Sequence, residues 1–320
     1  MNPTSDRKAP LGGIVLAFAV MYVAWGTTYL AIKHGVRDER LPVFLFGGSR
    51  IGTAGLILLL VQAARGRPLL PRRRDLPTIL GVSLLLFVCG NGLITLGQRT
   101  VDSGMASVLA ATTPLWMGLF AMLWPDGERL SPRGWLGVGL GLVGVALLLA
   151  PRLDDLAAFF GDPGPFLVIA SAASWALGSL ILKHSRKEGD HLTTAAQQMI
   201  CGGLLMCLLG LALGERQELP ERVTSGAAFA FCYLLIVGSL SGYVAFNWLL
   251  GHVSATKVGT YSYVNPVVAI LVAWAAGETI TWQIGAGILV ILFGVFLVRG
   301  GEKPLLAGDE ASGDVADDAG

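Results

Sequence analysis

Long apolar stretches alternate with short polar connections along almost the whole chain. Each stretch is close to the roughly 20 apolar residues that an α-helix needs to cross the hydrocarbon core of a bilayer. The connections hold most of the charged residues and many of the prolines. We therefore predict ten membrane-spanning helices, over residues 12–32, 42–64, 76–98, 103–123, 132–150, 164–184, 192–213, 226–250, 255–275 and 282–299.

The pattern favours helices over any other membrane fold. Backbone polar groups need partners in lipid, so only helices and closed barrels cross a membrane. A membrane barrel would show strict alternation over segments of about 10 residues, and this chain does not. The composition agrees, because 53% of the residues are hydrophobic and 14% are charged, whereas a soluble domain has about 25% charged residues. The predicted fold class is an all-α integral membrane protein.

The second half of the chain repeats the first at an offset of 148 to 152 residues. Trp25 matches Trp175, and Pro114 matches Pro266. Each half holds five helices, an odd number, so the second half enters the membrane in the opposite orientation. Such inverted-topology repeats are typical of secondary transporters. We predict an N-terminal segment 1–11, five-helix repeats over 12–151 and 152–300, and a disordered acidic tail over 301–320.

Lys and Arg residues are distributed unequally between the two predicted sides of the membrane. Fifteen fall on the side of the termini and seven on the other side, with Arg50 left inside a helix. Cytoplasmic loops carry the excess of Lys and Arg in membrane proteins. We therefore expect both termini, including the tail, in the cytoplasm, and a multi-pass protein of the cell (inner) membrane.

An ordered set of motifs runs through both halves of the chain: Trp25-Gly-Thr-Thr-Tyr29 with Lys33, Pro42, Arg50, Pro114, Gly127-Glu128 and their partners in the second half. This set resembles the EamA family of the drug/metabolite transporter superfamily. The resemblance covers roughly residues 12–300, and it implies export or exchange of small metabolites, often amino acids, through a central cavity. The second half departs from the pattern, since Gln198 stands where a counterpart of Arg50 is expected.

Two mirrored prolines indicate a candidate substrate site. Pro114 and Pro266 each interrupt an apolar helix, and proline kinks or breaks a helix because it removes a backbone donor. Paired interruptions in two halves of a transporter indicate the binding site. Alternatively, they reflect the general frequency of proline in membrane helices. The side chains that we expect to line the cavity around these kinks are Thr112, Trp116, Tyr261, Tyr263 and Asn265.

Further polar and aromatic residues lie well inside the predicted spans. They form groups at helical spacing on the first and sixth helices, and single amides on the third and eighth. The aromatic rings either line the cavity or anchor the helices at an interface. The amides either face the cavity or bond across helices. These candidates are Trp25, Thr28, Tyr29, Asn91, Trp175, Ser179 and Asn247.

Arg50 is the one charge predicted deep within a span. Charges at this depth are costly and usually face the bundle interior or a wet cavity. Two roles are open for this side chain. It either holds the carboxylate of a substrate, or it has a structural role in which it snorkels outward or caps the carbonyls of a broken helix. No Asp or Glu lies in the middle of any predicted span, which disfavours cationic solutes and a carboxylate proton relay.

The remaining patterns argue against catalysis and nucleic-acid binding. Gly139-Leu-Gly-Leu-Val-Gly144 has the letters of a dinucleotide fingerprint but lies inside a helix, and Gly137-x-x-x-Gly141 fits close helix packing. The four cysteines show no metal spacing, and the net charge is only +1. We expect no enzyme activity, no cofactor, no metal and no nucleic-acid partner.

The sequence therefore favours a secondary transporter, acting as an exporter of small metabolites such as amino acids by alternating access. The alternative is a non-transporting membrane protein, either a sensor or a lipid-modifying enzyme. The expected partners are a small-molecule substrate and the lipid bilayer. Because two fused halves already supply a pseudo-dimer in one chain, a monomer fits the pattern.

Overall fold

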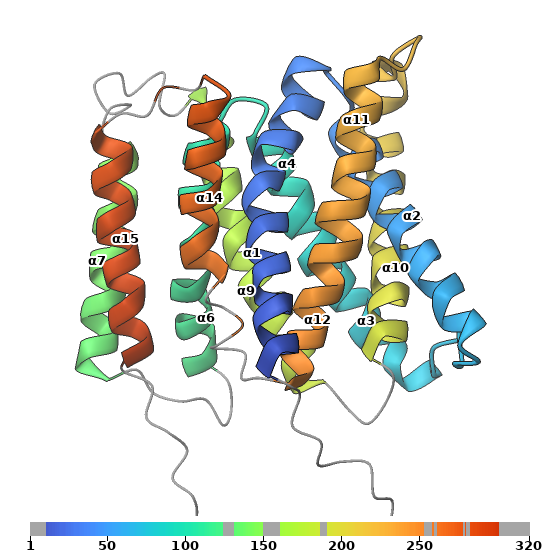
Figure 1. Cartoon of the computed structure of the whole chain (residues 1–320), viewed down its shortest axis with the longest axis horizontal. Coiled ribbons are helices and arrows are strands. Elements are labelled where there is room, and N and C mark those ends of the chain that lie inside the picture. The colour runs from blue at the N-terminus through green and yellow to red at the C-terminus, as the bar shows by residue number, and fades with distance from the viewer. Residues whose placement is uncertain are drawn as a thin grey trace, which may run out of the picture.

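The protein is a bundle of helices. The computed structural model describes residues 11–123, 131–149, 161–185, 191–252, 258, 261–277, 279 and 282–300. Within these ranges every regular element is a helix, as predicted, and the helices lie side by side across the molecule (Figure 1). The predicted segment before Leu11 and the predicted tail 301–320 lie outside the described residues.

Seven helical segments of the described chain are long and apolar enough to cross a membrane, and each covers one of the ten predicted spans. The other three predicted spans are also helical in their described parts but fall outside this group. They correspond to α7 (Pro132–Leu149), α14 (Tyr261–Ala275) and α15 (Trp282–Gly300). The seven segments are Leu11–Asp38, Val43–Ala64, Arg73–Gly97, Ser103–Met122, Gly164–His184, His191–Ala212 and Ser225–Leu250.

Three of these spans are regular α-helices: α2 (Val43–Ala64), α9 (Gly164–His184) and α10 (His191–Ala212). In the numbering of the ten predicted spans, the first span consists of α1 (Leu11–Lys33) and the π-helix η1 (His34–Asp38). The fourth is broken between α5 (Ser103–Ala110) and α6 (Thr113–Met122). The third begins with η2 (Arg73–Asp75) and α3 (Leu76–Ser83), then has the π-helix η3 (Leu84–Gly92) and α4 (Leu93–Gly97). The eighth of the ten predicted spans consists of α11 (Ser225–Tyr233), the π-helix η6 (Leu234–Gly242) and α12 (Tyr243–His252).

Apolar side chains both fill the bundle and cover its outer faces. Met21, Leu86 and Phe246 are fully buried in the core. Leu60 on α2 and Leu204 on α10 are well exposed, as expected for side chains that face lipid rather than water. The sequence therefore shows little contrast between the inner and outer faces of a helix.

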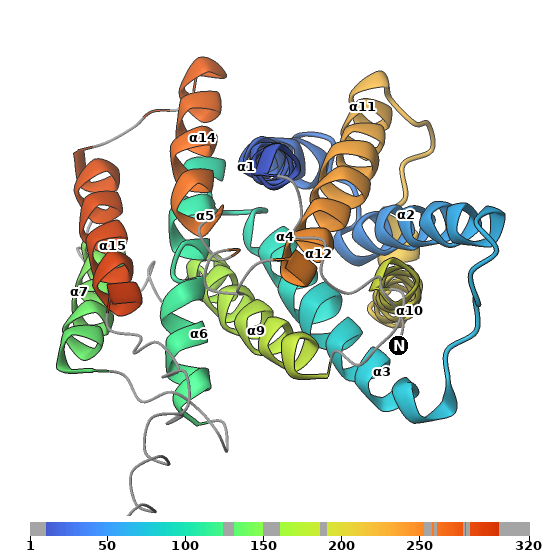
Figure 2. The same ribbon diagram turned by 60° about the horizontal axis from the view of Figure 1, so that its bottom comes forward.

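Glycines allow two helix pairs to pack closely. At one end of the molecule α2 crosses α10, and at the other end α7 lies against α15 (Figures 1 and 2). A Cβ atom on Gly203 of α10 would lie 2.5 Å from the backbone nitrogen of Gly52. A Cβ atom on Gly294 would lie 2.6 Å from the carbonyl oxygen of Gly137 and 2.7 Å from the nitrogen of Gly141. Gly137-x-x-x-Gly141 thus forms the close packing that its spacing predicts.

A buried carboxylate from the second half caps a helix of the first half. Glu215, in the 3₁₀-helix η5 (Glu215–Glu218), is 5% exposed. Its Oε2 accepts the backbone N–H groups of Phe44 and Leu45 at 2.9 and 2.8 Å. These donors belong to the first turn of α2, where backbone N–H groups have no partner within the helix and the helix dipole favours a negative charge. The carboxylate therefore fixes the start of α2 to the end of α10.

Replacing Glu215 with glutamine is expected to lower the thermal stability of the protein in detergent. The amide keeps the size but removes the charge and one acceptor, for an expected cost of about 1–2 kcal/mol. Thermal unfolding followed by size-exclusion chromatography measures this change. Glu218→Gln is the matched control, because Glu218 lies in the same short helix and forms a partly exposed pair with Arg99. An equal shift in both variants would contradict the capping role.

Candidate functional site

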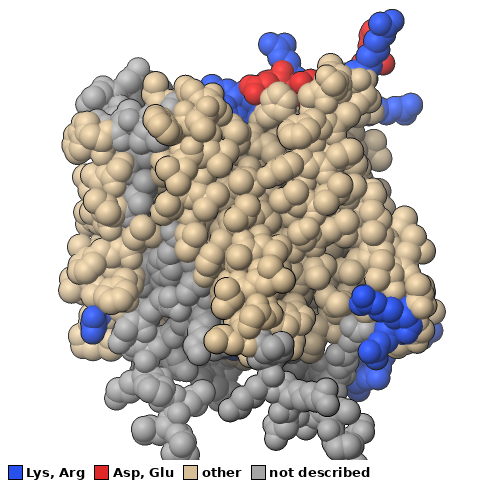
Figure 3. Space-filling view, in the orientation of Figure 1, with Lys and Arg blue, Asp and Glu red and all other residues tan. Residues whose placement is uncertain are grey.

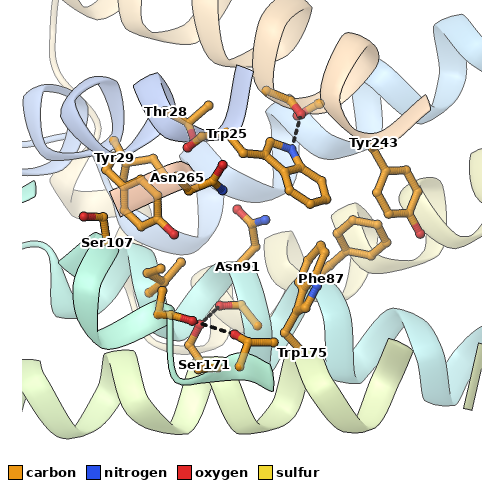
Figure 4. A pocket seen from close by; sticks show the side chains of 18 of the residues that line it. Trp25, Thr28, Tyr29, Phe87, Asn91, Ser107, Ser171, Trp175, Tyr243 and Asn265 are labelled. Carbon is orange, nitrogen blue, oxygen red and sulfur yellow. Dashed lines mark hydrogen bonds between the residues drawn. The ribbon is translucent and has the colours of Figure 1, made fainter. Parts of the chain in front are cut away.

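A central cavity of about 120 Å³ lies inside the bundle. Its walls come from both halves of the chain: α1, α2, η3, α4, α5 and Thr113 of α6 from the first half, and α9, α10, η6, Tyr243 of α12 and α14 from the second. Aromatic rings and a few polar groups point into this space (Figure 4). A cavity of this size takes a small solute, bound by an apolar wall with a few polar groups that fix its orientation.

Aromatic rings form one wall of the central cavity. The ring of Trp25 lies edge-on to those of Trp175 and Tyr261, at centroid distances of 5.5 and 4.9 Å. Phe246 packs behind both tryptophans, 5.3 Å from Trp25 and 5.9 Å from Trp175. The Trp25 Nε1 donates to the carbonyl oxygen of Gly238 at 3.1 Å, which fixes the ring (Figure 4). Both tryptophans thus belong to the interior rather than to a membrane interface.

Arg50 brings a positive charge into the same cavity. The side chain is 4% exposed. Its Nη1 donates to Ser239 Oγ at 2.7 Å and to the Leu234 carbonyl at 3.4 Å, and its Nη2 donates to Asn91 Oδ1 at 2.8 Å. All of these acceptors are neutral, and no Asp or Glu of the described chain pairs with this guanidinium. The charge is hydrogen-bonded but has no described counterion.

Two π-helices position polar groups beside Arg50. The π-helix η3 contributes Gly90 and Asn91 to the cavity, and η6 contributes Gly238 and Ser239. A π-helix shifts the hydrogen-bond register and is frequent at functional sites. The Gly90 carbonyl accepts from Ser171 Oγ at 2.8 Å, while the Gly238 carbonyl accepts from Trp25. Each π-helix therefore offers a carbonyl to a side chain of another helix.

Several polar atoms in the cavity wall are left without a hydrogen-bond partner in the described chain. They are buried, and they include both donors and an acceptor, so a bound solute has unoccupied groups of both kinds to bind. A solute that forms hydrogen bonds with these atoms gains more binding free energy than it would from neutral contacts at the surface, because unpaired buried polar groups are costly. These atoms are Arg50 Nε, Trp175 Nε1 and Asn265 Oδ1.

Eight of the residues predicted from the sequence line the central cavity. They come from α1, α2, η3, α9 and α14 and meet around one space (Figure 4). Tyr261 and Asn265 share a face of α14, as their spacing predicts. The eight residues are Trp25, Thr28, Tyr29, Arg50, Asn91, Trp175, Tyr261 and Asn265.

Four other candidates lie elsewhere. Thr112 is buried and bonds to the Leu109 carbonyl at 2.7 Å, and its neighbour Thr113 lines the cavity instead. Trp116 stacks on Phe120, beyond the cavity wall. Ser179 lines a separate cavity of about 20 Å³. Asn247 donates to the Tyr243 carbonyl and lines a second cavity, considered below. The side chain of Tyr263 lies outside the described residues.

The two prolines have different local structures. The fourth span is interrupted just before Pro114, because α5 ends at Ala110 and α6 starts at Thr113. Pro266 lies inside α14, which continues through it from Tyr261 to Ala275. The break at Pro114 turns the chain so that Thr113, rather than Thr112, reaches the cavity.

Several residues that line the central cavity were not predicted from the sequence. Phe87 and Tyr243 add aromatic surface, and three serines add hydroxyl groups. Small hydroxyl residues are common in membrane helices, so their identity alone gave no signal. The π-helices, which carry Asn91 and Ser239, have no simple sequence signature beyond nearby glycines. The missed serines are Ser107, Ser171 and Ser239.

No metal centre accompanies this cavity in the part of the chain that the structure describes, since no group of three or more His, Cys, Asp or Glu side chains there has metal-binding geometry. The four cysteines are free thiols rather than disulfides. The chemical groups available to a solute are therefore a guanidinium, amides, hydroxyls and aromatic rings. These groups can bind and orient a molecule.

Known proteins resemble this chain over nearly its whole length. The sequence model of the EamA-like transporter family matches residues 11–150 and 162–300. An uncharacterized inner membrane transporter of Escherichia coli K12, YedA, is 32% identical over 312 residues, which cover 93% of this chain and 95% of that protein. An uncharacterized transporter of Bacillus subtilis, YvbV, is 27% identical over 294 residues, covering 92% and 93%. A solved crystal structure has a TM-score of 0.64 at 20% identity, covering 90% of this chain and 98% of that one, which supports the fold.

The family match decides between a transporter and a non-transporting membrane protein, the two alternatives that the sequence left open. It falls on both halves of the chain, and YedA is named an inner membrane transporter and YvbV a transporter. The apolar helices are those of a multi-pass membrane protein. The protein is accordingly a membrane transporter rather than an enzyme, and the resemblance inferred from the motifs is confirmed. This chain belongs to the EamA-like transporter family.

Proposed function

We propose that the protein exports small carboxylate metabolites such as amino acids across the inner membrane, by alternating access around the central cavity. The observation that carries this proposal is the buried guanidinium of Arg50, which faces the cavity without a carboxylate of the described chain beside it. The bound solute would supply the missing negative charge. Trp25, Trp175 and Tyr261 would enclose the apolar part of the solute.

The Arg50 contacts favour substrate binding over a purely structural tie. A buried charge with only neutral partners carries a desolvation cost that a bound carboxylate would offset. The neutral partners hold the guanidinium in place, and Nε is left without a partner. Charge-assisted hydrogen bonds to a carboxylate are roughly twice as strong as neutral ones. Asn91 and Ser239 are in this view positioning residues for the arginine.

Asn265 is the proposed partner for the ammonium group of a zwitterionic solute. Its Oδ1 is a buried acceptor without a hydrogen bond in the described chain, and its amide points into the same space as that of Asn91 (Figure 4). A carboxylate held by Arg50 and an ammonium group held by Asn265 would together orient an amino acid.

The helix pairings support the inverted repeat. The second spans of the two halves, α2 and α10, pack against each other, and so do the fifth spans, α7 and α15. The first span of each half contacts the fourth span of the other, α1 with α14 and α9 with α6. The π-helices η3 and η6 begin at Leu84 and Leu234, an offset of 150 residues. A pseudo-two-fold axis through the cavity accounts for all of these features.

The distribution of charge supports cytoplasmic termini. The first described residue of α1 and the last of α15 lie at the same end of the bundle (Figure 1). At that end the visible charges are Lys and Arg, whereas both signs occur at the opposite end (Figure 3). The connection between α2 and α3 carries Arg65, Arg67 and the run Arg72–Arg74. The excess of basic residues marks the proposed cytoplasmic end.

Counterflow in proteoliposomes tests the proposed function. Vesicles loaded with an unlabelled amino acid are expected to accumulate the same labelled amino acid transiently, and at least one member of a panel of apolar and aromatic amino acids should do so. Absence of flux for every carboxylate tested, with monodisperse protein correctly inserted, would rule out the proposed substrate class.

Replacing Asn265 with alanine is expected to weaken recognition of the ammonium group selectively. We expect the half-saturating concentration of the transported amino acid to rise about tenfold, the effect of one lost charge-assisted hydrogen bond. The inhibition constant of its deaminated carboxylic acid should stay unchanged. Ser49→Ala on the exposed face of α2 is the control. Equal weakening of both solutes would contradict the assignment.

A further inference from the structure

A second cavity, of about 170 Å³, lies on the proposed cytoplasmic side of the bundle. It is enclosed by the connection between α2 and α3, by α3, by the end of α9 and by the first half of α10, together with Asn247 of α12. Arg72 and Arg74 line it and are exposed to solvent. Asp75 lines it as well, and its Oδ1 lies 3.7 Å from Arg74 Nε, so these three residues together carry one net positive charge. We call this space the basic-side cavity, and polar residues make up a larger share of its lining than of the central cavity.

The inner part of the basic-side cavity is built from buried amides. Gln198 is 1% exposed and Asn247 is 2% exposed. Gln198 Nε2 has no hydrogen-bond partner in the described chain. Gln197 Nε2 donates to the Leu69 carbonyl at 2.8 Å, which ties the connection to α10. The cavity is therefore a formed depression that reaches from charged surface groups to an unsatisfied buried amide.

The walls of the two cavities meet at a hydrogen-bonded pair of side chains, which we call the partition. Tyr243 lines the central cavity, and its hydroxyl donates to Gln198 Oε1 at 3.2 Å, while Gln198 lines the basic-side cavity. The Tyr243 ring packs edge-on against Phe87, with centroids 5.3 Å apart. Ser83 Oγ donates to the backbone carbonyl of Gln198 at 2.9 Å and holds that part of α10. The same ring also stacks on Phe246, with centroids 6.0 Å apart, so the partition combines a neutral hydrogen bond with aromatic contacts.

We propose that the basic-side cavity is the cytoplasmic vestibule of the transport path, and that the Tyr243–Gln198 pair is the gate between it and the central cavity. The proposal rests on the proposed transport function and adds the route by which a carboxylate solute enters. The excess of positive charge left by Arg72 and Arg74 over Asp75 would raise the local concentration of anionic solutes at the mouth. Opening includes loss of the hydrogen bond to Gln198 and rotation of the Tyr243 ring out of its contacts with Phe87 and Phe246. The unpaired Nε2 of Gln198 offers a donor to the passing carboxylate.

The gate position also accounts for the asymmetry between the two halves. Arg50 and Gln198 are matched by the repeat, yet the first lies in the central cavity and the second lies in the basic-side cavity. An amide can exchange partners between Tyr243 and a solute without leaving a buried charge unpaired. A second arginine at this position would hold an anionic solute in the vestibule.

Cysteine accessibility tests the gate without any measurement of flux. In a variant with the four native cysteines replaced by serine, Thr78→Cys reports on the basic-side cavity and Ala172→Cys on the central cavity. An impermeant methanethiosulfonate reagent is applied to inside-out vesicles. We expect fast modification at Thr78→Cys and slow modification at Ala172→Cys. Adding Tyr243→Ala should raise the rate at Ala172→Cys about tenfold or more from this side.

A second gate variant and a matched control keep the result interpretable. Gln198→Ala removes the acceptor but keeps the tyrosine ring, and it should raise the same rate by a smaller factor. Tyr233→Ala removes a tyrosine that donates to Thr27 Oγ1 at 2.6 Å, away from the partition, and should leave the rate unchanged. Equal rates at Ala172→Cys in all of these backgrounds, in monodisperse protein, would overturn the gate.

The remaining outcomes separate the gate from other uses of the cavity. Modification of Thr78→Cys only from the opposite membrane side would overturn the vestibule. Protection of Thr78→Cys by anionic phospholipid, but not by free carboxylates, would instead make the cavity a lipid headgroup site. If the labelling pattern holds but no amino acid shows counterflow, the partition stands and the proposed function fails. If counterflow occurs without the pattern, only the gate fails.

Discussion

Counterflow of a carboxylate solute is expected to fall by about a hundredfold or more when Arg50 is replaced with glutamine. The guanidinium is the positive charge of the central cavity, and it is held by Asn91 and Ser239. Removing one member of a buried, hydrogen-bonded charge pair costs about 2–5 kcal/mol, and about 1.4 kcal/mol corresponds to a tenfold change in affinity. Because the arginine partners are neutral, glutamine leaves no buried charge unpaired and the protein should still fold.

Two further variants show whether the charge or the geometry of Arg50 is responsible for the expected loss of counterflow. Arg50→Lys keeps the charge but cannot bridge Asn91 and Ser239 with a planar fork, so an intermediate loss is expected. Arg65→Gln, at the exposed end of the same helix, should retain normal flux. The fraction of monodisperse protein is measured for each variant alongside counterflow. Full transport by folded Arg50→Gln would show that this side chain is a structural tie.

Replacing Gly203 with alanine is expected to destabilise the α2–α10 pair. The added Cβ would lie 2.5 Å from the backbone nitrogen of Gly52 and 2.7 Å from the carbonyl oxygen of Gly48. Backbone atoms cannot rotate away as a side chain can, so the two helices must separate. Overpacking of this kind costs about 1–3 kcal/mol. Thermal unfolding in detergent should show a marked loss of folded protein.

Gly52→Ala is the matched control on the facing helix. A Cβ there would meet only the Cα of Gly203, at the ordinary contact distance of 3.8 Å. Alanine is favoured over glycine in a helix by about 0.8–1.0 kcal/mol, so this variant should be neutral or slightly more stable. Similar stability of the two alanine variants would contradict the close crossing.

The sequence predicted the helices and many cavity residues because membrane helices leave strong signals. A run of apolar residues defines a span without any knowledge of its neighbours, and the repeat brought Trp25 and Trp175 together as a pair. Arg50 was identified because a charge at that depth is costly. These predictions depend on the bilayer, which acts on every residue of a span in the same way.

The rotation of each helix was harder to predict from the sequence. The spans are apolar on the lipid side as well as inside, so periodicity does not separate Ser171, which faces the cavity, from residues that face lipid. The π-helices add a further shift of register. With an offset of 150 residues Asn91 corresponds to Ser241 rather than to Asn247, which lies beyond η6 in α12. The two amides therefore line different cavities.

In the proposed function, the central cavity recognises a carboxylate through Arg50. The most direct test of this recognition is inhibition of counterflow by pairs of compounds that differ only in this group, each amino acid of the panel against its own carboxamide. If Arg50 binds the carboxylate, the acid is expected to inhibit counterflow at least about tenfold more strongly than the amide in the unmodified protein. This preference is expected to disappear in Arg50→Gln. Equal inhibition by acid and amide in the unmodified protein would contradict the claim.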